Sequence, residues 1–108
     1  MSHDLVAQRA ETYAVFADIQ AESDLPDTAD LDYAFVAQGA ADWEAAEAAL
    51  AEAGFDCART PDEDGTAYLA VRLPDQPVTA MAIWLGEEAA TQLVLAHGFL
   101  PDGWGFSA

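Results

Sequence analysis

The chain has 108 residues, 53% of them hydrophobic, which fits one domain with a core of its own and excludes global disorder. Its 20 Asp and Glu residues against 3 Arg, with no Lys, give a formal net charge of −17. Such a chain cannot neutralise phosphates, so nucleic acid and anionic membranes are poor candidate partners, whereas basic protein surfaces would be attracted. Solubility, or adaptation to a salty cytoplasm, explains the same charge equally well.

The sequence predicts one cytoplasmic domain over residues 1–108. Cys57 is the single cysteine, so no disulfide can form within the chain. Residues 1–4 lack the basic start and apolar run of a secretory signal, and no apolar stretch is long enough to span a bilayer. No internal repeat or linker divides the chain.

The first half of the chain predicts a helix, a strand and a second helix. Residues 4–22 have the periodicity of an amphipathic helix. Its inner face is expected to present Val6, Ala10, Tyr13 and Ala17, with Leu5, Phe16 and Ile19 widening that face. Residues 31–38 alternate as a strand does, and because both faces carry apolar side chains we expect this strand to be central in a sheet. Residues 41–53 predict a helix that Gly54 ends in a left-handed conformation. Its apolar stripe comprises Trp43, Ala46, Leu50 and Ala53.

Two strands and a third helix are predicted next. Residues 55–60 and 66–73 read as strands joined by a hairpin loop over 61–65, where Gly and Asp favour a tight turn. The helix that follows is capped by Asp75 or Thr79 and runs to about residue 97. Its inner stripe would contain Val78, Ala82, Leu85, Ala89 and Ala96. A strand over 80–85 followed by a shorter helix is the alternative.

The tail over residues 99–108 predicts a turn and a short closing strand, with Trp104 and Phe106 on one face. The order of elements is then a helix followed by strand, helix, strand, strand, helix and strand. This order predicts an α+β fold, a ferredoxin-like βαββαβ sandwich over residues 31–108 with an antiparallel sheet and an additional N-terminal helix.

No catalytic, metal or cofactor site stands out among the reactive residues. His3 lies near a terminus that we expect to be mobile, and His97 suits a cap at a helix C-terminus better than a catalytic base. Cys57 lies on a predicted strand and is interpreted as a small buried hydrophobe. Zinc spacing is absent, and the acidic run 62–65 lacks the length and distal Glu of a calcium loop, so we interpret it as a solvated hairpin with weak cation binding at most. No glycine-rich phosphate loop is present.

The tail contains the most distinctive residues, Asp102, Gly103, Trp104 and Gly105. Tryptophan buries a large area, and the flanking glycines let the backbone approach another surface. The favoured interpretation is that Trp104 fills the core and that the glycines permit a bulge. A partner-binding hot spot formed by these four residues is the functional alternative. Core packing is also preferred for Trp43 and Trp84.

Several short motifs, taken in order, resemble the regulator of ribonuclease activity B family, whose members inhibit ribonuclease E. They are residues 8–12 (Gln-Arg-Ala-Glu-Thr) in the first helix, Asp-Trp-Glu at 42–44, Gly-Phe at 54–55 and Asp-Gly-Trp-Gly at 102–105. The resemblance spans nearly the whole chain and implies a variation of the ferredoxin-like fold. The best-known members continue into a long acidic tail beyond the last motif, whereas this sequence stops at Ala108 and has its acidic residues along the body.

The resemblance implies a non-enzymatic regulator that docks on the arginine-rich C-terminal region of ribonuclease E and changes RNA turnover. An acidic domain suits such a basic protein partner electrostatically. A ferredoxin-like small-molecule sensor or a self-associating structural module, such as a homodimer, is the alternative. An enzyme would need His97 beside a carboxylate inside a concave pocket.

Overall fold

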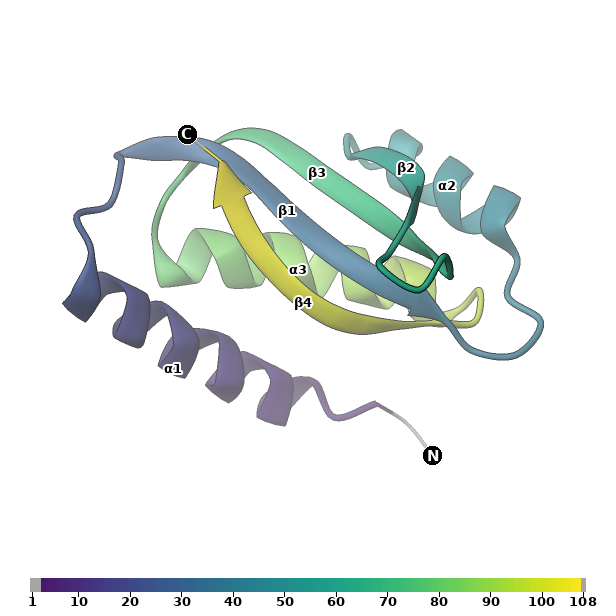
Figure 1. Cartoon of the computed structure of the whole chain (residues 1–108), viewed down its shortest axis with the longest axis horizontal. Coiled ribbons are helices and arrows are strands. Elements are labelled where there is room, and N and C mark those ends of the chain that lie inside the picture. Colours follow the sequence, from purple (N-terminus) through teal and green to yellow (C-terminus); the bar gives the residue numbers. More distant parts are fainter. Residues whose placement is uncertain (1–2, 108) are drawn as a thin grey trace.

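The fold is built on a four-stranded antiparallel sheet with strand order β2-β3-β1-β4. The computed structural model describes residues 3–107. Its elements are α1 (Leu5–Glu22), β1 (Thr28–Ala37), α2 (Trp43–Glu52), β2 (Asp56–Pro61), β3 (Ala67–Pro77), α3 (Ala80–Leu95) and β4 (Phe99–Ser107). Helices α2 and α3 lie on one side of the sheet, whereas α1 runs beside β4 and packs on α3 (Figure 1). The predicted ferredoxin-like α+β fold with an extra N-terminal helix is confirmed.

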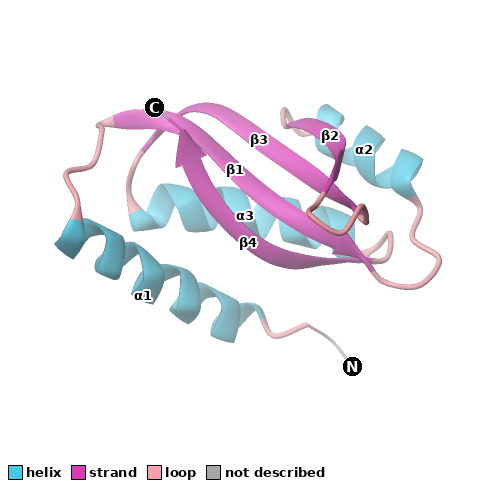
Figure 2. Ribbon diagram, in the orientation of Figure 1, coloured by secondary structure: helices cyan, strands magenta, loops and turns pink. Residues whose placement is uncertain are grey.

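Strand β1 is central, as predicted, because it pairs with β3 on one side and with β4 on the other. Its odd residues Leu31, Tyr33 and Phe35 are buried among the helices, and its even residues face the opposite side of the sheet. Figure 2 shows this opposite side with the strands in front of α3. The four strands therefore have one face in the core and one face without a helix over it.

Strands β1 and β3 are longer than the predicted 31–38 and 66–73, because they stay paired as far as Thr28 and Pro77. A β-bulge maintains this pairing. Leu31 is opposite Leu73 while Ala29 is opposite Gln76, so β3 contains one more residue than β1 in this interval. Asp75 adopts a left-handed φ of 59° there, and its amide donates to the Asp30 carboxylate at 3.1 Å.

Helix α3 begins after Thr79, whose hydroxyl accepts a hydrogen bond from the Ala82 amide at 3.1 Å. The alternative strand over 80–85 is therefore wrong, and so is most of the predicted inner stripe, since Leu85, Ala89 and Ala96 are exposed. The buried residues are instead Ile83, Trp84, Gly86, Glu87, Ala90, Thr91 and Val94. Apolar residues surround most of this helix, so their spacing does not reveal which side faces the core.

The predicted inner face of α1 is only partly right: Phe16 is buried as expected, but Val6 is 81% exposed and the other buried residues are Gln8 and Thr12. The polar residues face inward because they bond to α3. Helix α2 agrees better with its prediction: Ala46 and Leu50 are buried, and Gly54 ends the helix with a φ of 94°. Among the three tryptophans predicted to pack in the core, Trp84 is buried and Trp43 is half-buried against the core cluster.

Gly86 in the middle of α3 is required by Tyr33. The Tyr33 hydroxyl donates to the Ile83 carbonyl at 2.9 Å, and a Cβ on Gly86 would collide with that hydroxyl and lie 3.1 Å from Tyr33 Cζ. Burial raises the pKa of the Tyr33 hydroxyl well above its usual range, and the nearby Glu87 and Asp32 raise it further. The hydroxyl is thus kept as a donor.

We expect Gly86→Ala to lower the free energy of unfolding by about 1–3 kcal/mol, although alanine favours an exposed helix by roughly 1 kcal/mol over glycine. The cause is the collision with the Tyr33 hydroxyl. Urea unfolding measures the effect, and Gly105→Ala is the control, because a Cβ there meets no atom within 4 Å. In a Tyr33→Phe background the Gly86→Ala change should cost less; an equal cost would contradict the collision.

Candidate protein-interaction surface

The Asp-Gly-Trp-Gly tetrapeptide at 102–105 forms a β-bulge in the edge strand β4. Phe35 is opposite Pro101 while Ala34 is opposite Gly103, so Asp102 has no partner on β1. Gly103 has a φ of 145°, a conformation that side chains disfavour. Glycine therefore occupies the position in the bulge, residue 103, where the backbone departs from the strand conformation.

The bulge changes which side of the sheet each later residue faces. With the extra residue, Trp104 is opposite Tyr33 and Phe106 is opposite Leu31, so both aromatic rings are on the core face. Both are half-buried against the core. This geometry agrees with the interpretation that Trp104 packs on the core and the glycines permit a bulge; partner binding by these four residues stays a prediction.

Two hollows lie on either side of β4 at this point. The first, which we call the sheet trough, has a volume of about 670 Å³ on the helix-free face. Its residues are Asp32, Tyr33, Ala34, Asp56, Cys57, Ala58, Tyr68, Ala70, Val71, Arg72, Gly103, Trp104 and Gly105. The second, the α1 hollow, has a volume of about 550 Å³ between α1 and β4. Gly103 and Trp104 line both hollows, Gly105 lines the trough and Asp102 lines the α1 hollow.

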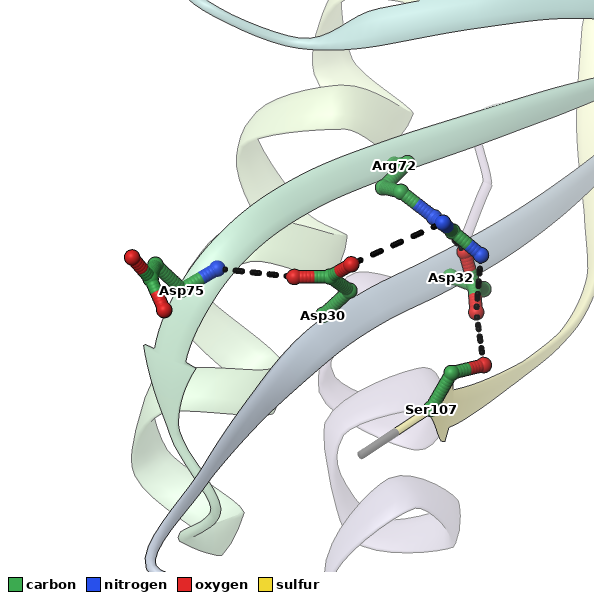
Figure 3. Close-up of polar contacts among 5 residues, drawn as sticks. All are labelled: Asp30, Asp32, Arg72, Asp75 and Ser107. Atoms are coloured by element: carbon green, nitrogen blue, oxygen red, sulfur yellow. Dashed lines mark hydrogen bonds and ion pairs between the residues drawn. The ribbon is translucent and has the colours of Figure 1, made fainter.

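A chain of polar contacts crosses three strands at one end of the trough (Figure 3). Arg72 on β3 donates through Nε to Asp32 on β1 at 2.8 Å, and its Nη1 lies 3.5 Å from an Asp30 carboxylate oxygen. Asp32 also accepts from the Ser107 hydroxyl on β4 at 3.1 Å. Hydrogen bonding to Asp32 raises the pKa of the Arg72 guanidinium. The single cation of the trough is therefore engaged by carboxylates of the same face.

The α1 hollow has a buried carboxylate at its base. Glu87 is 4% exposed and accepts from Gln8 Nε2 at 3.0 Å and from the Thr12 hydroxyl. Gln8 also donates to the Thr91 hydroxyl at 3.1 Å, and the His3 ring is hydrogen-bonded to the Gln8 side-chain oxygen. Gln8 and Thr12 satisfy Glu87 and join α1 to α3, so the network has a structural role.

The remaining candidate residues lie apart from these features. His97 lines neither hollow; its carbonyl accepts from the Asp42 amide at 2.9 Å. Cys57 is half-buried, and burial raises the pKa of its thiol, with Glu47 and Asp56 adding to the effect. In the hairpin, Asp62 and Asp64 accept from nearby amides, and hydrogen bonding to Asp62 and Thr66 lowers the pKa of Asp64 to about 2.

Within residues 3–107, no group of three or more His, Cys, Asp and Glu side chains is placed to hold a metal ion. No helix in this range is long and apolar enough to cross a membrane. Sequence reasoning identified the tetrapeptide but missed the three alanines that line the trough, Ala34, Ala58 and Ala70. The alternation Asp32-Tyr33-Ala34 indicated two faces, but which strands meet on the open face depends on pairing between distant segments.

The topology, the extra N-terminal helix and the bulged closing strand define an α+β domain of the ferredoxin-like class with one uncovered sheet face. Residues 9–106 match the model of the family described as regulator of ribonuclease activity B, which covers nearly the whole chain. The chain belongs to this family. A search of curated proteins finds none that matches it.

Deletion of Asp102 is expected to destabilise the protein far more than Asp102→Ala. Asp102 is exposed and makes no side-chain hydrogen bond within residues 3–107, so its truncation should change the free energy of unfolding by less than about 0.5 kcal/mol. Deletion removes the bulge and turns Trp104 and Phe106 toward the open face, losing partial burial that is worth on the order of 1 kcal/mol per side chain. Urea unfolding followed by tryptophan fluorescence compares the two; equal stability would show that the bulge does not set the register.

Proposed function

We propose that this protein is a non-catalytic regulator that binds ribonuclease E through a basic region of the enzyme and thereby modulates RNA turnover. The observation that carries the proposal is the family match over residues 9–106, since the family is one of regulators of ribonuclease activity. A basic region of the ribonuclease is proposed as the binding site because the family resemblance implies it and because this domain is strongly acidic.

The distribution of charge supports a basic partner. All three arginines have contacts within the protein: Arg59 forms a salt bridge with Glu47, Arg72 binds Asp30 and Asp32, and the Arg9 guanidinium lies 4.9 Å from the centre of the Tyr13 ring. Most of the 20 carboxylates form no salt bridge with another residue in the range 3–107. The acidic side chains therefore produce a field that accelerates encounter with a cationic surface.

The same charge makes self-association a weaker proposal. Two copies that meet through their open sheet faces would each carry a formal net charge of −17 over the whole chain. Repulsion of this kind opposes a homodimer unless salt or a cation compensates it. A sensor of small molecules would use one of the two hollows, but neither gives direct support for a particular ligand.

Calorimetric titration of the protein against the basic C-terminal half of its host's ribonuclease E, at low and at physiological salt, tests the proposal. We expect saturable one-site binding that weakens but persists at physiological salt, because part of the attraction is screened. Poly-arginine of similar charge is the control for unspecific attraction. Absence of binding, or binding no tighter than that of poly-arginine at physiological salt, would contradict the proposed function.

A further inference from the structure

We propose that the sheet trough is the docking site for the partner, and that its occupant is a cationic polypeptide segment. This inference rests on the proposed function and adds the surface and the chemistry of the bound segment. The register of the sheet brings the side chains of this site together on the helix-free face.

The floor of the trough is a continuous row of small residues across all four strands. Ala58 on β2 is opposite Ala70 on β3, Ala70 is opposite Ala34 on β1, and Ala34 is opposite Gly103 on β4. Neighbouring strands lie about 4.8 Å apart, so the row is roughly 14 Å across. Gly105 lies two residues further along β4, opposite Asp32, so the next row also has no side chain on this strand. Because no large side chain stands on this row, a partner's backbone and side chains can approach the sheet closely.

The row beside this floor provides the charge. Asp56 is opposite Arg72, Arg72 is opposite Asp32, and Asp30 lies further along β1 within 3.5 Å of the same guanidinium. Asp30 and Asp32 therefore contact Arg72, Asp56 is opposite it in the register, and each carboxylate can accept several hydrogen bonds. Asp56 is exposed and forms no salt bridge within residues 3–107. An incoming Arg or Lys side chain finds unused acceptors here, close to an apolar floor.

The same face argues against RNA as its ligand. Four-stranded modules that read RNA from a sheet face stack the bases on aromatic side chains. Here the rows across the middle of the face contain Ala, Gly, Asp and one Arg, Arg72, whose guanidinium is bonded to Asp32, and Tyr68 is the aromatic residue that β3 presents to the trough. Aspartates also repel phosphates. The surface thus favours a cationic polypeptide over a nucleic acid.

Two matched pairs of variants test the trough. Ala34→Gln fills the floor without changing the charge, and Ala89→Gln makes the same change on the exposed side of α3. Asp56→Asn removes one charge from the trough, and Asp18→Asn removes one from the exposed side of α1. Each protein is titrated by calorimetry with the basic C-terminal half of ribonuclease E at physiological salt, after urea unfolding has verified its fold.

We expect Ala34→Gln to raise the Kd about tenfold or more, and Asp56→Asn to raise it several-fold, while both controls bind as the unmodified protein does. If Ala34→Gln does not fold, Ala58→Gln on the edge strand provides the same obstruction. Equal effects of Asp56→Asn and Asp18→Asn, together with unchanged binding of Ala34→Gln, would overturn the trough as the site but leave the proposed function intact.

The other outcomes separate the two proposals. If the unmodified protein does not bind the ribonuclease region at all, the proposed function fails first. A fluorescein-labelled single-stranded RNA is titrated in parallel. Binding of that RNA that Ala34→Gln abolishes would overturn the cationic polypeptide as the occupant.

Discussion

The strict alternation of side chains along β1 is the constraint on which the rest of the structure depends. Leu31, Tyr33 and Phe35 are almost fully buried, so the odd positions must face the helices and the even positions must face away. Both neighbouring strands adjust to this central strand. Strand β3 bulges near Asp75 and β4 bulges at Asp102, whereas β1 contributes no extra residue at either place. Because of these bulges, β3 and β4 keep their large side chains on the core side of the sheet although each contains an extra residue.

The same alternation explains why the core and the trough are linked. Each residue that β1 buries is followed by one that it presents on the open face, so Tyr33 and Ala34 belong to opposite sides of a single strand. Tyr33 requires a glycine in α3 because of its size, and Ala34 is part of the small-residue floor. A slip of β4 by one residue would remove Trp104 from the core and place its ring on the open face. The bulge at Asp102 thus preserves both the packing on one side and the shallow surface on the other.

The sequence predicted the order and type of the elements because local signals determine them. Thr79 and Asp42 have side chains suited to helix N-caps, and Gly54 suits a left-handed helix end. The inward face of α1 was not predictable in this way, since Gln8 and Thr12 are buried by virtue of a partner, Glu87, that is more than 70 residues away. A hydrophobic pattern assigns such polar residues to solvent. The open face of the sheet escaped prediction for a related reason, because Ala58, Ala70 and Ala34 become neighbours only through strand pairing.

Two of the arginines lie on opposite sides of the sheet and form salt bridges with different groups of carboxylates. Arg59 bridges β2 and α2 through Glu47 and lies 5.3 Å from the centre of the Trp43 ring, which itself packs edge-on against Phe99. It therefore serves the helix side of the fold, whereas Arg72 is on the open face among Asp30, Asp32 and Asp56. Arg72 reduces the mutual repulsion of these aspartates and so allows all of them to lie on one face of the sheet. Its single positive charge does not neutralise all three carboxylates, so the face remains negative. A cationic segment that enters the trough would then meet acceptors already oriented by a resident guanidinium, at little cost in side-chain ordering. This arrangement relates the stability of an acidic sheet to its suitability for binding a basic partner.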